Sequence, residues 1–307
     1  MTKISVIGAG NVGAEVARRT AEKNLGDVVL VDIVEGVPQG KALDMLQSSP
    51  IEKFSSKIGG TNDYSLIKDS DVVVVTAGLA RKPGMTREDL VTKNGQIITF
   101  VGEQIKKYAP NSIVIVVTNP LDVMAQLMWK VTKFPPKRVV GMAGILDTAR
   151  FITFISMETN VPAAKIEAMV IGGHGDAMVP LTKYTTVDGK NIHEVLSKEK
   201  VDAIIQRTRD GGAEIVKLLK TGSAYYAPSS SAVQMVESII KNKRQTLPCS
   251  VYLTGQYGLN DVYIGVPAVL GREGVEGIMD YSLTPEETHV LHTSANVIKD
   301  TLLLCEK

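Results

Sequence analysis

The 307-residue chain has few cysteines, almost no net charge and no long apolar run. Its two cysteines, Cys249 and Cys305, are too few for a disulfide scaffold or a four-thiolate zinc site. The 34 lysines and arginines nearly balance 33 aspartates and glutamates, so no overall field attracts nucleic acid or a membrane surface. No apolar run approaches the ~18 residues that span a bilayer, and we expect no secretory leader. These absences predict a cytoplasmic protein that binds neither nucleic acid nor membrane.

The first half of the chain alternates short apolar runs with stretches of helical spacing. The runs are rich in β-branched residues and occur at residues 3–7, 27–32, 71–77, 112–118 and 138–142. Helical spacing lies between them, most clearly at residues 12–23 and 95–108. Strands that are apolar on both faces and separated by helices are typical of a parallel sheet that helices cover on both sides. We therefore expect an α/β protein with a doubly wound parallel sheet, whose ligands bind at the carboxyl ends of the strands.

The second half has a different pattern. Short strands are expected at residues 183–187, 250–254 and 262–266, with a turn at Asp188-Gly189. Helices are expected at residues 200–219, 231–241 and 285–304, the last with Thr284 as its N-cap. Strands with hairpin-like spacing favour an α+β domain. We place the boundary near Gly144, which predicts two domains at residues 1–144 and 145–307.

A glycine-rich motif directly follows the first expected strand and opens the first helix. It consists of Gly8, Ala9, Gly10, Asn11, Val12 and Gly13. In such a motif the glycines permit a tight turn, let the backbone approach a diphosphate, and let the helix pack on the strand. The next strand ends in Asp32, whose carboxylate can accept both ribose hydroxyls and would repel a 2′-phosphate. The pattern predicts a dinucleotide site that prefers NAD to NADP, although Asp32 can also simply cap a turn.

A basic loop leaves the third apolar run at residues 77–87. It carries Arg81, Lys82 and Arg87 around a Pro-Gly turn, which predicts a mobile lid. An arginine fork suits a carboxylate, so Arg81 and Arg87 are candidate ligands of an anionic substrate. The alternative is a solvated surface loop, and we assign Lys82 to that role.

His174 stands among glycines in the segment 172–176. Imidazole titrates near neutrality and can exchange a proton with an alcohol, although a histidine in such a turn can also be structural. Asp147 and Arg150 are three residues apart and share one side of an expected helix. The aspartate could orient the imidazole while the arginine binds an anion; the alternative is a weak surface ion pair. Sequence spacing alone does not place Asp147 beside His174.

These motifs together resemble the lactate/malate dehydrogenase superfamily, and most closely its lactate-dehydrogenase-like bacterial malate dehydrogenases. The resemblance covers the whole chain and includes the Thr118-Asn119-Pro120 segment and residues 222–228. It implies an NAD-binding Rossmann domain, an α+β substrate domain, hydride transfer to NAD, no catalytic metal, and a homodimer or homotetramer. Segments 33–47 and 200–219 are candidate subunit contacts.

The resemblance also implies roles for individual residues. His174 and Asp147 match the catalytic pair, Arg150 the substrate clamp, and Arg87 the arginine that polarises the reacting carbonyl. Asn119 matches an asparagine near nicotinamide and substrate. Further cofactor contacts are implied for Asn94, Val117 and Thr118, beside the residues 8–13 and Asp32.

Arg81 is the residue that distinguishes the expected substrate. Lactate dehydrogenases carry glutamine at the matching position, whereas malate dehydrogenases carry arginine. A second carboxylate in a closed, dry site needs a countercharge. The expected activity is therefore the reversible oxidation of (S)-malate to oxaloacetate, a reaction of the tricarboxylic acid cycle. Oxidation of lactate, a 2-hydroxy monoacid, is the alternative, and a non-catalytic NAD-binding protein is a further one.

Overall fold

The computed structural model describes residues 2–79, 86–175 and 177–305. The described residues of the first half form six parallel strands in the order β3-β2-β1-β4-β5-β6. These are β1 (Lys3–Ile7), β2 (Asp27–Val31), β3 (Ile58–Thr61), β4 (Val72–Val75), β5 (Ile113–Val116) and β6 (Val139–Gly141). This strand order is that of a doubly wound dinucleotide-binding sheet, so the expected α/β class is confirmed.

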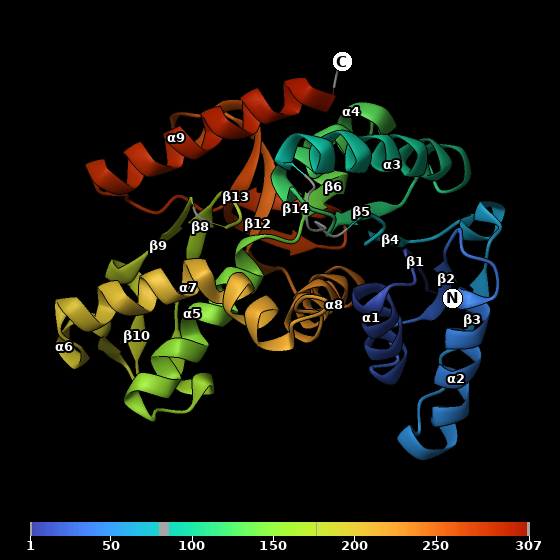
Figure 1. Ribbon diagram of the computed structural model, residues 1–307, viewed down its shortest axis with the longest axis horizontal. Helices are drawn as coiled ribbons and strands as arrows, with labels where there is room; N and C mark the ends of the chain where they lie inside the picture. The colour runs from blue at the N-terminus through green and yellow to red at the C-terminus, as the bar shows by residue number, and fades with distance from the viewer. Residues whose placement is uncertain (1, 80–85, 176, 306–307) are drawn as a thin grey trace.

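Helices cover both faces of this sheet. They are α1 (Asn11–Glu22), α2 (Val37–Glu52), α3 (Arg87–Tyr108) and α4 (Leu121–Thr132). In Figure 1, α3 and α4 lie on one side of the strands, and α1 and α2 lie on the other. All residues of β4 and β5 are buried, as expected for strands covered on both faces.

The second half extends the same sheet with antiparallel strands. These are β12 (Gln245–Thr254), β13 (Asn260–Gly271), β14 (Gly274–Ile278), β8 (Val170–Gly172) and β9 (Met178–Pro180). The junction is narrow, because β12 joins β6 through the single pair of Ser250 and Gly141. A side chain at Gly141 would come within 2.8 Å of the Ser250 Cβ, so this junction requires glycine. A second, small sheet contains β7 (Ile166–Glu167), β10 (Thr186–Val187) and β11 (Lys190–Asn191).

In the part of the chain that the structure describes, five further helices pack around these strands. They are α5 (Gly144–Thr159), α6 (Ile192–Val195), α7 (Lys198–Leu219), α8 (Tyr226–Ile240) and α9 (Pro285–Leu302). Helix α5 packs against α7, while α8 packs against α1 and so connects the two halves (Figure 1). Thr284 caps α9 in a reciprocal arrangement with Glu287, which confirms the expected start of this helix.

Several element boundaries differ from the sequence expectation. Arg87 begins α3 instead of belonging to a loop, because Thr86 and Asp89 form a capping box. Residues 183–187 were expected as one strand but contain the end of a 3-10 helix (Thr182–Tyr184) followed by β10. Strand β3 was missed, since Gly59 and Gly60 weaken the strand pattern. Gly144 begins α5, and a domain boundary there remains a prediction.

None of the described helices is both long and apolar enough to cross a membrane.

Candidate active site

The glycine-rich motif forms a tight turn between β1 and α1. Gly8 has φ +106°, and a Cβ there would lie 2.6 Å from the Ala77 backbone nitrogen. A Cβ at Gly13 would lie 1.8 Å from the Gly8 carbonyl oxygen, so the helix can approach the strand only with glycine at this position. At Gly10, by contrast, a Cβ would meet no atom within 4 Å. This open space lies at the N-cap of α1, where free N–H groups and the helix dipole suit a diphosphate.

Asp32 connects this turn with the end of β2. Its Oδ2 accepts a hydrogen bond of 2.6 Å from the Ala9 N–H, and its Oδ1 accepts one of 3.0 Å from the Val34 N–H. Lys41 of α2 supports the same turn by donating to the Ala9 carbonyl at 2.7 Å. Asp32 therefore closes a turn, which was one of the two roles expected from the sequence, and it also lines a cavity.

That cavity has a volume of about 640 Å³ and opens beside the glycine-rich turn. Asp32, Gly8 and Gly10 line it together with apolar side chains that the sequence analysis missed: Ile33, Val34, Tyr64, Leu79, Ile97, Phe100 and Val101. Ile33 is 79% exposed, and the rings of Tyr64 and Phe100 meet edge to face at 5.4 Å. The two apolar residues that directly follow Asp32, Ile33 and Val34, were the feature of the sequence that could have indicated this cavity. An apolar slot next to a diphosphate cradle fits the flat base of a dinucleotide.

The expected cofactor residues that follow β5 lie at the carboxyl edge of the sheet. The N–H of Val117 donates to the Val75 carbonyl at 2.8 Å, and the Thr118 hydroxyl donates to the Ala77 carbonyl at 2.7 Å. Asn119 is exposed at the following position, at the start of the connection to α4. These residues stand where a doubly wound sheet binds its ligands.

The side chain of Asn94, in α3, makes hydrogen bonds to the backbone at this edge of the sheet. Its side chain is buried, and its Oδ1 accepts a hydrogen bond of 2.8 Å from the Leu79 N–H. Its Nδ2 donates to the Asn119 carbonyl at 2.7 Å and to the Leu79 carbonyl at 3.2 Å. The side chain of Asn94 thus holds the backbone of both neighbouring strand ends.

His174 and Asp147 are brought together from distant parts of the chain. His174 lies in the turn after β8, and Asp147 lies in the first turn of α5. The imidazole Nδ1 is 2.9 Å from Oδ2 of Asp147, and the two side chains are only 16% and 2% exposed. Burial by itself lowers the pKa of His174, but the charge of Asp147 and its hydrogen bond outweigh this effect and raise the pKa above the ordinary value.

Arg150 completes this group from the next turn of α5. Its Nη1 lies 3.6 Å from Oδ1 of Asp147, and burial lowers the pKa of the guanidinium. Among the described residues the guanidinium makes no hydrogen bond, although its side chain is only 14% exposed. Its N–H groups are thus partly desolvated and free to bind an anion such as a carboxylate.

A glycine pair in the middle of α7 makes room for Arg150. A Cβ at Gly211 would lie 3.2 Å from Cδ of Arg150, and a Cβ at Gly212 would lie 3.5 Å from its Nη2. Neither glycine was predicted from the sequence to have a role in the site. Two adjacent glycines inside a helical pattern were a usable signal, because glycine weakens a helix.

The structure does not describe the side chains of two expected substrate residues, Arg81 and Arg87. Arg81 and Lys82 lie outside the described residues, as does Asp176, and the structure describes the backbone of Arg87 but not its side chain.

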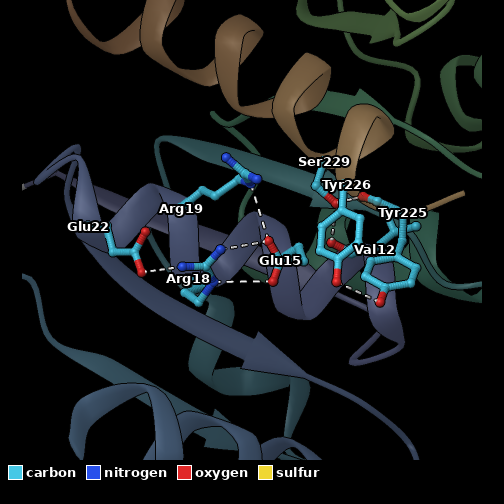
Figure 2. A network of polar contacts seen from close by, with 8 residues as sticks. All are labelled: Val12, Glu15, Arg18, Arg19, Glu22, Tyr225, Tyr226 and Ser229. Carbon is cyan, nitrogen blue, oxygen red and sulfur yellow. Dashed lines mark hydrogen bonds and ion pairs between the residues drawn. The ribbon is translucent and has the colours of Figure 1, made fainter. Parts of the chain in front are cut away.

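The segment 222–228 is connected to the glycine-rich turn. Figure 2 shows Ser229 of α8 directed at the start of α1, where its hydroxyl lies 3.0 Å from the Val12 carbonyl oxygen. The same hydroxyl bonds to the Tyr225 carbonyl, one helical turn earlier. This contact holds the end of the segment against the diphosphate cradle.

Within the described ranges no group of three or more His, Cys, Asp or Glu side chains is arranged to hold a metal ion.

Comparison with known proteins agrees with this geometry. The family model for the lactate/malate dehydrogenase NAD binding domain matches residues 2–141. The family model for the lactate/malate dehydrogenase alpha/beta C-terminal domain matches residues 145–306. A malate dehydrogenase of Roseiflexus sp. (strain RS-1) is 56% identical over 98% of this chain and 97% of its own length. One from Chloroherpeton thalassium is 53% identical over 99% of this chain and 98% of its own.

Solved structures extend the comparison to three dimensions. The malate dehydrogenase from Picrophilus torridus in its apo form superposes with a TM-score of 0.97 and 46% identity, covering 99% of this chain and 97% of that one. A lactate dehydrogenase from Cryptosporidium parvum, complexed with lactic acid and nicotinamide adenine dinucleotide, gives a TM-score of 0.96 at 43% identity and covers 100% and 98%. The resemblance inferred from the motifs is confirmed: the chain belongs to the lactate/malate dehydrogenase family.

Proposed function

We propose that this protein catalyses the reversible, NAD-dependent oxidation of (S)-malate to oxaloacetate. The observation that carries the proposal is the buried group of His174, Asp147 and Arg150, which combines a proton acceptor with an anion site. The full-length similarity to malate dehydrogenases supports malate as the substrate.

The glycine-rich turn and the apolar cavity would hold the cofactor. The turn at residues 8–13 would bind the diphosphate, Asp32 would bind the ribose, and the slot beside Tyr64 would bind the adenine. Val117, Thr118 and Asn119 would border the nicotinamide end, and Asn94, which bonds to the Asn119 carbonyl, would support them. When bound, NAD supplies the acceptor for the hydride that leaves C2 of malate.

His174 would move the proton. Because Asp147 accepts the hydrogen on Nδ1, the neutral imidazole keeps its lone pair on Nε2, which can take the proton from the C2 hydroxyl. The resulting imidazolium is stabilised by the Asp147 carboxylate. In the reverse direction, protonated His174 returns the proton to the carbonyl oxygen of oxaloacetate.

Arginine side chains would bind the two carboxylates. Arg150 takes the carboxylate next to the reacting carbon, because its partly desolvated guanidinium suits a bidentate contact. By the family resemblance, Arg81 takes the second carboxylate and Arg87 polarises the carbonyl. Asn119 would contact both substrate and nicotinamide.

The test combines one variant with two substrates. We expect His174→Asn to bind NADH as the wild type does, measured by fluorescence titration, because the cradle is unchanged. NADH oxidation with oxaloacetate should fall by roughly 10²–10⁴-fold. Near-normal turnover in this variant would refute the acid–base role.

Substrate class is tested by the wild type and by Arg81→Gln. We expect the wild type to prefer oxaloacetate to pyruvate, and Arg81→Gln to move this preference toward pyruvate because the second carboxylate loses its countercharge. Removing one partner of a desolvated ion pair costs about 2–5 kcal/mol. A wild type that prefers pyruvate would make the protein a lactate dehydrogenase, the activity named for the similar Cryptosporidium parvum structure.

We also propose that the protein works in the cytoplasm as a homodimer or homotetramer, within the tricarboxylic acid cycle. Exposed apolar side chains on α2 (Leu43, Ile51) and near the end of α7 (Val216, Leu218) support an assembly through these helices. Neither Cys249 nor Cys305 forms a disulfide within the part of the chain that the structure describes, which supports a reducing compartment. Sedimentation of the purified protein tests the assembly.

A further inference from the structure

The turn that carries His174 is rich in glycine, and its backbone is therefore flexible. Gly172 and Gly175 have φ angles of +89° and +106°. Gly173 directly precedes the histidine and Gly175 directly follows it. Glycine gives the backbone the most freedom of any residue. Proton transfer, however, requires the imidazole to stay aligned with the reacting oxygen, and an error of 1 Å can reduce turnover by about 10²-fold. The turn therefore needs support from outside.

Two side chains from different helices supply this support. Ser294 of α9 accepts a hydrogen bond of 3.1 Å from the N–H of Gly173. Asp122 of α4 accepts one of 3.0 Å from the N–H of His174 through its Oδ2. Both side chains are almost fully buried, at 2% and 5% exposure. Two consecutive backbone N–H groups next to the imidazole are thus held by buried acceptors.

Ser294 lies very close to the turn, and burying the charge of Asp122 has a cost in free energy. A Cβ at Gly173 would lie 2.3 Å from the Ser294 hydroxyl oxygen, so only glycine permits this approach. The second oxygen of Asp122 is buried beside the Ser250 hydroxyl without a well-directed hydrogen bond. Burial raises the pKa of Asp122, which reflects the unfavourable environment for its charge. Apolar packing would avoid this penalty, so the acceptor at Asp122 has a use that compensates for it.

We propose that Asp122 and Ser294 are positioning residues that fix the backbone of His174, so that its imidazole stays between Asp147 and the substrate. This inference rests on the proposed acid–base role of His174. Neither residue touches the substrate; each acts through the histidine. Helix α9, at the end of the chain, and helix α4, which follows Asn119, thereby both contribute to the site.

Loss of either acceptor has two expected consequences. The imidazole leaves its alignment with the reacting oxygen, so kcat falls. The bond between Nδ1 and Asp147 also weakens, so the pKa of His174 falls. The charged groups that face His174 are Asp147, Arg150 and Asp122, and of these Asp147 contributes most to the raised pKa.

Ser294→Ala tests the anchor on α9. We expect kcat with oxaloacetate to fall by about 10-fold while KM for NADH stays unchanged. The pKa of His174, followed by NMR of its ring protons without substrate, should decrease. The matched control is Ser238→Ala, since Ser238 lies in a different helix, α8, is fully buried, and donates to the Leu270 carbonyl at 2.8 Å. The control should lower the melting temperature but change neither kcat nor the histidine pKa.

Asp122 is tested by a disruptive and a conservative variant. Asp122→Ala removes the acceptor and should lower kcat by about 10- to 100-fold. Asp122→Asn retains an oxygen for the His174 N–H and should recover kcat to within about 3-fold of the wild type. The proposal is overturned if Asn is as damaging as Ala, or if Ser294→Ala leaves both kcat and the histidine pKa unchanged. Absence of malate oxidation in the wild type would instead refute the proposed function, and the NMR titration would still report on the anchors.

Discussion

The imidazole Nδ1 of His174 lies 2.9 Å from Oδ2 of Asp147, although 27 positions separate the two residues in the chain. Helix α5 delivers the carboxylate, and the turn after β8 delivers the ring. The contact determines which ring nitrogen carries the proton in the neutral form and raises the pKa of His174 despite its burial. The acid–base properties of the site thus depend on how two separate segments pack.

Asp147→Asn should move the pH dependence of turnover. The pKa of His174 is raised in the folded protein, so oxaloacetate reduction, which uses the protonated ring, is favoured below this pKa and declines as the pH rises through it. Without the Asp147 charge, burial lowers the pKa, and the decline should move to lower pH. We also expect kcat to fall by on the order of 10²-fold or more. A pH profile of NADH oxidation measures both effects, and a decline at the wild-type pH would contradict this account.

Asp32→Ser should weaken the preference for NAD over NADP. The substitution removes the charge that would repel a 2′-phosphate, and it also weakens the bond to Ala9. We expect KM for NAD to rise by about 10-fold and the ratio of kcat/KM between the two cofactors to move toward NADP. Asp27→Ser is the control, because Asp27 starts the same strand and bonds to Lys57. If both variants change the ratio equally, Asp32 has no role in discrimination.

Gly211→Ala should stabilise α7 and impair substrate binding. Alanine in a helix is favoured over glycine by about 1 kcal/mol, but the new Cβ would press on Cδ of Arg150 at 3.2 Å. We expect several-fold higher KM for oxaloacetate with unchanged KM for NADH, from steady-state kinetics. Gly40→Ala in α2 is the control, because its Cβ would meet no atom within 4 Å. An unchanged KM for oxaloacetate would show that Arg150 tolerates the contact.

Glu237→Gln should make the protein less stable at neutral pH. Hydrogen bonds from Lys243, Lys23 and Lys241 lower the pKa of Glu237 from 4.5 to about 2. A carboxylate whose pKa is lowered by folding stabilises the fold fully at a pH above its pKa in the unfolded chain. This stabilisation is lost as the pH falls through its pKa in the folded protein. Because the three lysine side chains are about half exposed, we expect a loss of only about 1–2 kcal/mol at pH 7, vanishing near pH 2.

Urea denaturation at several pH values measures this difference. Glu273→Gln is the control, since its side chain is 69% exposed and pairs only with Lys137 among the described residues. A destabilisation by Glu237→Gln that does not depend on pH would point to lost packing in place of lost charge interactions.

Local patterns in the sequence determined much of the first half of the fold. Strands β1, β2, β4, β5 and β6 were predictable, because a strand covered on both faces needs a continuous apolar run such as Val72–Val75. Strand β3 was not predicted, because its two central residues are glycines. Its pairing with β2 depends on backbone hydrogen bonds, which require no particular residue types. The glycine-rich turn with Asp32 was predictable since a strand, turn and helix within 32 residues contain the whole motif.

Tertiary structure alone decided which distant residues meet. It joined the two halves into one sheet at Ser250 and Gly141, placed Asp147 beside His174, and turned Asp122 and Ser294 toward the backbone of the histidine turn. Hydrophobic periodicity depends on neighbours within a few positions, and so a sequence displays it directly. Contacts across tens or hundreds of residues result from the packing of whole helices and strands, and the residue types involved are the same whether or not the partners meet.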